Sequence, residues 1–288
     1  MMKKLYFSML LVAGLALAAC SSDDSDNTPV IKTYTMTVDA TKGTNDVIKH
    51  IATRALSLDG STLNASWATT EEVFVQGTYV SDGTTKFWFK GSIMPQYAGT
   101  TTRLNGRISL PDGSSYTSID EAIGTPHTLT LQFPRSGELD YTGQVGTLAD
   151  IAAKYDYAIA SNVRVDVEAD KVVGVKEVAF KNQQAIVKFT LKDKSDGTTL
   201  LNPTALTVRV EEPETGTLID EVTLSSIPDA TYTINGDGVL FVAIQEFEAK
   251  KVILTATVGG KTYTFIMSGV TFVNGKYYEI NVQMVAQS

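Results

Sequence analysis

The stretch KVILTATVGGKTYTFIM, Lys251 to Met267, decides the fold class. It contains two runs in which apolar and polar residues alternate, joined by Gly259-Gly260. Alternation with a period of two places the apolar side chains on one face of a β-strand. A Gly-Gly dipeptide permits the positive φ angles that a tight hairpin turn requires. The stretch therefore predicts an antiparallel hairpin with one buried face.

The same alternation recurs elsewhere in the chain. Three further segments show it: TYTMTVD with Tyr34, Met36 and Val38 on one face, AIVKFTLKD with Ala185, Val187, Phe189 and Leu191, and YYEINVQM with Tyr278, Ile280, Val282 and Met284. Asp-Gly or Asn-Gly turn signals recur at 59–60, 82–83, 112–113, 196–197, 235–236 and 274–275. Many short alternating strands with such turns predict an all-β protein built from antiparallel β-sandwiches.

The mature chain is long enough for about two domains. One segment, TLADIAAKYDYAIAS, has apolar residues at helical spacing after Thr147, a suitable N-cap residue. We expect a short helix there, near the middle of the chain, and place the domain boundary at residues 160–161. An N-terminal β-sandwich would then span 32–160 and a C-terminal one 161–288, each large enough for its own core.

The N-terminal segment has the features of an export signal. Lys3 and Lys4 precede an almost wholly apolar run at 5–19, shorter than the roughly 20 residues of a membrane-spanning helix. The run ends in Leu-Ala-Ala before Cys20, the only cysteine of the chain. This tetrapeptide resembles the bacterial lipobox, which implies that residues 1–19 are a signal peptide and that Cys20 carries acyl chains such as palmitate. A buried free cysteine and a catalytic thiol are the alternatives, but no basic partner for a thiolate is nearby in the sequence.

The segment after Cys20 is polar, acidic and without periodicity. Residues 20–31 are therefore predicted to be a disordered tether. The segment SSDDSDNTP also resembles the acidic export signal of surface lipoproteins in some Gram-negative bacteria, and a solvated spacer is an equal alternative. Without Lys3 and Lys4 the chain keeps 22 basic and 32 acidic residues, a formal net charge of −10. This acidity argues against nucleic acid as a partner.

The sequence contains no motif typical of catalysis, cofactor binding or metal binding. His50 and His127 are far apart, and each lacks an obvious metal-ligating neighbour. The paired carboxylates Glu71-Glu72 and Glu211-Glu212 are adjacent, so on a strand they would point to opposite faces. We therefore expect no enzyme, no cofactor and no metal site.

Together with the lipobox, four longer segments resemble the fimbrillin family, the lipoprotein precursors of type V pili that include Mfa-like subunits. The segments are HIATRALSLDGSTLNASWATTEEVFV (His50 to Val75), LTLQFPRSGELDYTGQVGTLADIAAKYDYA (Leu129 to Ala158), NQQAIVKFTLKDK and INGDGVLFVAI. The resemblance covers nearly the whole mature chain. It implies two β-sandwiches of transthyretin-like topology and a place on the cell surface, in a fimbria or at the outer membrane.

The resemblance also implies a route of assembly. A trypsin-like or arginine-specific protease cuts a loop after the first strand, and a strand of a neighbouring subunit fills the edges that this strand leaves unpaired. Such head-to-tail contacts build an open filament. Mapped onto this sequence, the removable strand is Thr33–Asp39, with Tyr34, Met36 and Val38 on its inward face. The cut falls at Arg54-Ala55, in a polar loop flanked by Thr41-Lys42-Gly43-Thr44 and by Asp59-Gly60. The candidate donor strands are Tyr263–Met267 and Tyr278–Met284, the second with Tyr278, Ile280, Val282 and Met284 on one face. Arg54 as an ordinary solvated residue is the alternative.

The leading function is thus a structural or adhesive fimbrial subunit. Its expected partners are other pilin subunits, the outer membrane through the lipid on Cys20, and a receptor on a host or bacterial surface. Only Val285–Ser288 follow the last alternating run, so no separate long donor extension is visible. This speaks against a stalk subunit and leaves tip, accessory and anchor roles open. A surface glycan-binding lipoprotein is the alternative, since Trp67, Trp88 and the Phe87–Phe89 cluster could form an aromatic platform. A secreted enzyme is a third hypothesis, which no motif in the sequence supports.

Overall fold

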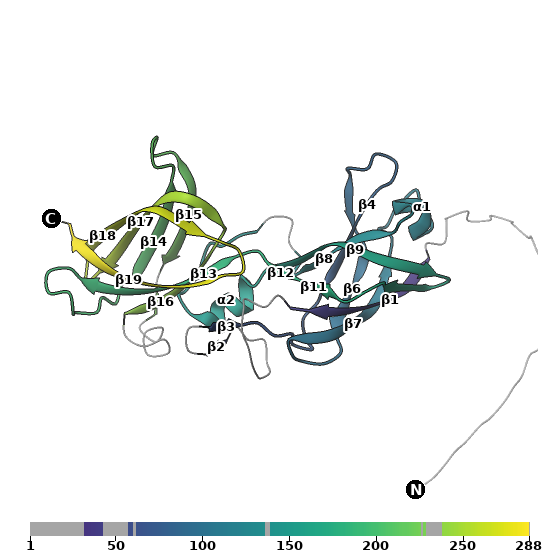
Figure 1. Cartoon of the computed structure of the whole chain (residues 1–288), viewed down its shortest axis with the longest axis horizontal. Helices are drawn as coiled ribbons and strands as arrows, with labels where there is room; N and C mark the ends of the chain where they lie inside the picture. Colours follow the sequence, from purple (N-terminus) through teal and green to yellow (C-terminus); the bar gives the residue numbers. More distant parts are fainter. Residues whose placement is uncertain are drawn as a thin grey trace, which may run out of the picture. The chain divides into compact units, whose positions relative to one another are not determined.

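The structure is a computed structural model that describes residues 32–42, 57–59, 62–135, 139–225, 227–228 and 238–287 (Figure 1). The described residues belong to one compact unit of the chain, Ile31–Ser288. The predicted signal peptide at 1–19, the predicted tether at 20–31, Cys20 and the Arg54-Ala55 bond lie outside the described residues.

The described chain is all-β, as predicted. Its strands form two large sheets, with a separate small hairpin of β2 (Ser57–Asp59) and β3 (Thr62–Asn64). The described residues form two short helices, α1 (Ile119–Ile123) and α2 (Leu148–Lys154). Neither of these helices could span a membrane.

The first sheet contains ten described strands around an apolar core. Their main order is β5-β4-β8-β9-β10-β1-β7-β6, with β11 on β1 and β12 on β9. The bounds are β1 Thr33–Thr41, β4 Phe74–Thr78, β5 Lys86–Trp88, β6 Lys90–Pro95, β7 Thr101–Ser109, β8 Thr128–Phe133, β9 Ala158–Glu168, β10 Lys171–Gly174, β11 Val178–Ala179 and β12 Lys181–Asn182. An isolated antiparallel bridge between Val73 and Ile93 links the start of β4 to β6, so the sheet curls back on itself.

The second sheet contains seven described strands in the order β15-β14-β17-β18-β19-β13-β16. The bounds are β13 Ala185–Asp193, β14 Ala205–Glu211, β15 Leu218–Ser225, β16 Val239–Ile244, β17 Phe247–Val258, β18 Lys261–Phe272 and β19 Tyr277–Ala286. The side chains of its buried face form a second apolar core, separate from that of the first sheet.

The hairpin predicted from the Gly-Gly dipeptide is confirmed. Strands β17 and β18 pair as far as Val258 and Lys261, and Gly259 and Gly260 form the turn with φ angles of 55° and 78°. Left-handed φ values of this kind cost glycine nothing but are rare for other residues, which explains the dipeptide at this turn.

The sheets are not purely antiparallel, which differs from the prediction. Strand β1 pairs in parallel with β10 and β11, and β19 pairs in parallel with β13. Both exceptions join strands that are far apart in the sequence. Alternation reports which face of a strand is buried, but it carries no information on the direction of such a distant neighbour.

The predicted helix is present but shorter than its sequence segment. The Thr147 side chain accepts a hydrogen bond from the Asp150 amide, as an N-cap residue should, and the helix ends at Lys154. From Ala158 the chain continues as β9. Helix α1 was not predicted, although Ser118 and Glu121 have the spacing of a capping box and Gly124 follows the helix with a φ of 66°.

The change from the first sheet to the second falls later than the predicted boundary at 160–161. Strand β9 pairs with β8 and β10, and β12 pairs with β9, so the first sheet continues to Asn182. The second sheet begins with Ala185. The predicted boundary follows helix α2, whereas β9, the long strand after this helix, returns into the first sheet. As a division into separate domains, the limits 32–160 and 161–288 stay a prediction.

Candidate functional site

Strand β1 lies in the interior of the first sheet and is paired along both edges (Figure 1). All nine of its residues pair with β7, from Thr33 with Ser109 to Thr41 with Thr101. On the other edge Thr35–Thr37 pair with β10, and Ala40 and Thr41 pair with β11. A strand with two paired edges contributes backbone hydrogen bonds to both neighbours, so its loss would leave two edges open.

The alternating face of β1 is part of the first core. Tyr34 and Met36 are fully buried, and Val38 and Ala40 are 1% exposed. The predicted inward face of Tyr34, Met36 and Val38 is therefore confirmed as a burial pattern. Opposite Met36, Gly106 of β7 allows close approach of β6, because a Cβ there would lie 2.1 Å from the carbonyl oxygen of Ser92.

Polar contacts add to the attachment of β1. The Ile119 amide at the start of α1 donates to the Tyr34 hydroxyl oxygen at 3.2 Å. The side-chain Nδ2 of Asn105 donates to Thr37 Oγ1 at 2.8 Å, and on the surface Arg103 binds the Asp39 carboxylate with two nitrogens. The Arg103 guanidinium lowers the pKa of Asp39, mainly by hydrogen bonding, but the pair is exposed and therefore contributes little to stability.

Lys42, the residue after β1, continues the buried face of the strand. Its side chain is 1% exposed, and its Nζ lies 2.8 Å from Glu71 Oε1 and 2.9 Å from Asp156 Oδ2. The ammonium also lies over the rings of Phe133 and Trp67, at 4.4 and 5.1 Å from the ring centroids. We call Lys42, Glu71 and Asp156 the buried ion cluster.

The two carboxylates of the cluster are held by other parts of the chain. Glu71 Oε2 accepts a hydrogen bond from the Ala68 amide at 3.1 Å, and Asp156 Oδ1 accepts one from Gln184 Nε2 at 3.2 Å. Lys42 in turn is fixed by its own backbone amide, which donates to the Thr100 carbonyl oxygen at 2.9 Å. The cluster therefore joins the end of β1 to side chains that do not belong to β1.

Burial and charge have opposite effects on Lys42. Burial alone would lower the pKa of Lys42, but the charges and hydrogen bonds of Asp156 and Glu71 raise it above its ordinary value. Burial also raises the pKa of Glu71, and Lys42 offsets this only in part. The two carboxylates thus keep the ammonium charged, and the ammonium in turn opposes the effect of burial on Glu71.

The structure extends the predicted removable strand. The prediction ends it at Asp39, but β1 continues to Thr41, and Lys42 is buried. Of the adjacent Glu71 and Glu72, Glu71 is buried in the cluster and Glu72 is exposed, so the two do not act as a pair. The parity of the strand could have placed Lys42 inside, because it follows Tyr34, Met36, Val38 and Ala40 at the same spacing. Nothing in the sequence indicates its partners.

The predicted donor strand β19 is attached differently from β1. It pairs with β13 from Tyr277 to Met284, but with β18 only at Ala286 and Val285 among the described residues. Val282 and Met284 are buried, whereas Tyr278 and Ile280 are half-buried. The other candidate, Tyr263–Met267, lies within β18 and pairs along its length with β17.

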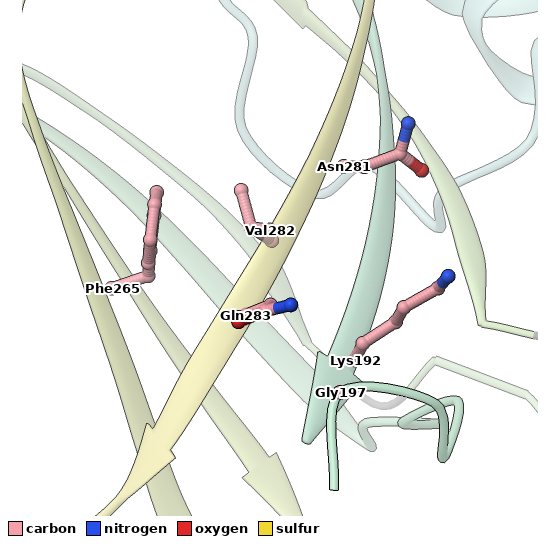
Figure 2. A pocket seen from close by; sticks show the side chains of 6 residues that line it. All are labelled: Lys192, Gly197, Phe265, Asn281, Val282 and Gln283. Carbon is pink, nitrogen blue, oxygen red and sulfur yellow. The ribbon is translucent and has the colours of Figure 1, made fainter. Parts of the chain in front are cut away.

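A cavity of about 360 Å³ opens where β18 and β19 separate. It is lined by Lys192, Gly197, Phe265, Asn281, Val282 and Gln283. Figure 2 shows that these residues come from β13 and the turn after it, from β18 and from β19. The cavity thus marks the edge along which β19 lacks a second neighbouring strand.

Most of the aromatic residues that could form a glycan platform are buried. Trp67 is fully buried and packs edge-on against Phe180 at 5.0 Å between ring centroids. Phe87 and Phe89 belong to the first core. Trp88 is half-buried, and the Arg135 guanidinium lies 5.3 Å from the centroid of its ring.

The described residues contain no group of three or more His, Cys, Asp or Glu side chains placed to hold a metal ion. His127 lies 2.7 Å from Asp120 through Nε2, and His50 is outside the described residues. Glu211 is paired with Arg209 and Lys251, and Glu212 with Lys250. These carboxylates therefore serve as ion-pair partners, with Glu211 buried at the end of β14.

No known family model matches the sequence, and no curated protein matches it. Three similar solved structures are a fimbrial protein from Bacteroides ovatus, a fimbrial assembly protein from Parabacteroides distasonis and the tip fimbrial protein Mfa3 from Porphyromonas gingivalis. The identities are 12%, 12% and 7%, and the TM-scores are 0.38, 0.39 and 0.35. The matches cover 88%, 87% and 87% of this chain, and 49%, 91% and 95% of the other chains. This chain thus spans about half the length of the Bacteroides ovatus protein.

Proposed function

We propose that the chain is a structural or adhesive subunit of a surface fimbria, in which β1 is removed by proteolysis and replaced by a strand of another subunit. The observation that carries the proposal is the place of β1: it is interior to its sheet and paired on both edges. Every strand with which it pairs follows residue 56 in the sequence. A single cut between residues 43 and 56 would therefore break the covalent link between β1 and all of its pairing partners.

A vacated β1 site would be a strong acceptor for an extended strand. The backbone groups of β7 on one side and of β10 and β11 on the other would lose their partners, and each unpaired buried group costs about 1–3 kcal/mol. The pockets of Tyr34, Met36 and Val38 would also open to water, at about 1.5–3 kcal/mol for each large apolar side chain. A strand from another chain recovers both contributions, which is the mode of β-strand addition.

Of the two candidate donor segments, β19 is the better suited. It has a full neighbour on one side only, and the cavity beside Val282 and Gln283 lies along its other edge. Release of β18 would break its long pairing with β17 as well. A donor strand on one subunit and an acceptor site on the next give a head-to-tail contact, which extends without closing.

The proposal includes the route to the surface. Cys20 would carry the lipid that holds the precursor at the outer membrane, with residues 20–31 as a tether, and the cut at Arg54-Ala55 would release β1 there. Two acyl chains or more give stable membrane attachment. The alternative of a glycan-binding lipoprotein is favoured by no observation, since Trp67 is buried and Arg135 lies over Trp88.

Limited proteolysis with a labelled strand tests the proposal. The chain without residues 1–19 is digested with trypsin and incubated with a fluorescent peptide of residues 32–42. The first new N-terminus is expected at Ala55, and the peptide is expected to enter the cut chain but not the intact one. Arg54→Gln should abolish this first cut, whereas Lys49→Gln is the matched control. A first cut elsewhere, or a cut chain that excludes the peptide, contradicts the proposal.

A further inference from the structure

The buried ion cluster limits which strand can take the place of β1. Lys42 directly follows β1 and lies two residues beyond Ala40, where it continues the inward face of the strand. Its ammonium is the cationic partner of two buried carboxylates, Glu71 and Asp156. The inward positions of β1 therefore form a pattern of four apolar side chains followed by one cation.

Removal of β1 takes away the cation and leaves the carboxylates behind. Glu71 stays attached to the Ala68 amide, and Asp156 stays attached to the Gln184 side chain. In the vacated site water can reach the two carboxylates. A strand that refills the site without a cation would bury both of them again with neither water nor a counter-ion, and a buried charge without a partner is strongly destabilising.

We infer that the vacated β1 site selects a strand with a basic side chain, lysine above all, at the position of Lys42. This inference rests on the proposed strand replacement. A strand with an apolar residue at this position would fill the pockets of Tyr34, Met36, Val38 and Ala40 but would bury Glu71 and Asp156 without a cation. The acidic end of the site thus adds a charge requirement to the apolar pattern, and it also fixes the register, since a shift by two residues moves the cation out of reach.

The requirement bears on the identity of the partner. If β19 of a second copy entered the site in the direction of β1, Ile280, Val282, Met284 and Ala286 would occupy the four apolar positions. Ser288 would then fall at the position of Lys42, and residues 277–288 contain no Lys or Arg. The segment after Tyr263 in β18 has Thr271 at the corresponding position. In this direction neither candidate strand supplies the cation, and the strand that completes this subunit would come from a different kind of subunit. In the opposite direction Lys276 or Lys261 would fall at the position of Lys42, and a second copy of this chain would meet the requirement.

Competition between strand peptides tests the charge requirement. A site-specific protease sequence is inserted between Arg54 and Ala55, the chain is cut, and a labelled peptide of residues 32–42 is allowed to enter. Unlabelled peptides then compete for the site. The Lys42→Met peptide is expected to need an about 100-fold higher concentration than the native peptide near neutral pH, the loss expected when a buried charge loses its partner. The Lys32→Met peptide has the same net charge and is the matched control, because Lys32 is exposed; it should compete within about threefold of the native peptide.

The pH dependence separates charge from shape. The titratable side chains that face Nζ of Lys42 are Glu71 and Asp156. Nζ also donates to the Ser66 carbonyl oxygen at 3.4 Å and lies over the rings of Trp67 and Phe133. Between about pH 7.5 and about pH 5 the disadvantage of the Lys42→Met peptide should shrink about tenfold, because burial raises the pKa of Glu71 and a protonated Glu71 needs no cation. A groove with Glu71→Gln and Asp156→Asn should bind the Lys42→Met peptide at least as well as the native one. If that variant does not fold, the test is the ratio of the competing concentrations of the native and Lys42→Met peptides on the unaltered groove, measured at both pH values.

The outcomes distinguish the two proposals. Equal competition by the native and Lys42→Met peptides overturns the charge requirement and leaves strand replacement standing. If even the native peptide fails to enter the cut chain, strand replacement itself is overturned, and the charge requirement with it.

Discussion

Strands β1 and β19 have similar sequences in pattern, since both alternate apolar and polar residues, but the sheets hold them in different ways. Every residue of β1 pairs with β7, and most of the strand also pairs with β10 or β11. Strand β19 has one full neighbour, β13, and meets β18 at one end. The inward side chains of β1 are all buried, whereas Tyr278 and Ile280 of β19 are half-buried.

An alternating pattern therefore predicts a strand but not the role of that strand. A strand with two paired edges and a filled face leaves a shaped groove when it is removed. A strand with one paired edge can leave at a lower cost in hydrogen bonds and packing, since fewer partners are left unsatisfied. The proposed acceptor and donor roles follow from this contrast, which substitutions and hydrogen exchange can test.

The largest effect is expected for the charge that ends β1. Lys42→Met should lower the free energy of unfolding by about 3–5 kcal/mol near neutral pH, because Glu71 and Asp156 stay buried without a cation. Lys90→Met, which removes an exposed ion pair with Asp112, should cost no more than about 1 kcal/mol. Urea unfolding of both variants measures the difference.

The loss in Lys42→Met should also depend on pH. Burial raises the pKa of Glu71 above its value in the unfolded chain, so the contribution of Glu71 to stability is fully present at low pH and is lost as the pH rises through the raised pKa. Without Lys42 this effect should strengthen, and the variant should regain stability as the pH falls toward about 5. A loss that stays constant over this range would contradict the charge argument.

The next effect concerns packing. Met36→Ala should cost about 2–5 kcal/mol, because Met36 is fully buried and its removal opens a cavity beside β7. Ile280→Ala in half-buried β19 should cost less than about 2 kcal/mol, since water can reach the space that it leaves. Equal losses in urea unfolding would mean that the two strands are held alike.

Hydrogen exchange should then rank the two strands without any mutation. The amides of β1 are expected to exchange only through global unfolding, because both edges are paired. Amides in the Tyr277–Gln283 part of β19 that do not face β13 should exchange about 100-fold faster or more. Mass spectrometry of peptides from the two strands provides the measurement, and equal protection would remove the distinction between acceptor and donor.

The smallest effect is expected at two turns that share the sequence SDGTT, at 81–85 and at 195–199. In each, the aspartate accepts hydrogen bonds from the two threonine amides and from the second threonine hydroxyl. These bonds lower the pKa of Asp82 and of Asp196 to about 2, chiefly through the hydroxyls of Thr85 and Thr199.

Because these pKa values are lowered, the stabilisation is present above the ordinary aspartate pKa of 3.8 and is lost as the pH falls toward 2. Carboxyl titration by NMR should show both low values. Thr85→Val and Thr199→Val should each raise the pKa of the aspartate in the same turn only. Different behaviour of the two turns would show that the surrounding sheet, rather than the turn sequence, sets the pKa.

These turns illustrate what could be predicted from the sequence. The Gly259-Gly260 hairpin, the N-cap at Thr147 and the inward face of Tyr34, Met36 and Val38 depend on neighbours within a few residues, and all three are present. Helix α1 was equally local, but its short apolar pattern gave no helical repeat. The parallel pairing of β1 and the position of β9 in the first sheet depend on distant strands, and neither was predicted.

The sequence by itself determined the all-β class, the inward faces of the strands and the geometry of the tight turns, because alternation and glycine act over a few residues. Only the tertiary structure decided that β1 lies between two neighbours and that Lys42 is buried with Glu71 and Asp156. A buried charge requires partners, and these come from distant parts of the chain that folding alone brings together. The charge that limits the choice of partner strand is therefore a property of the fold.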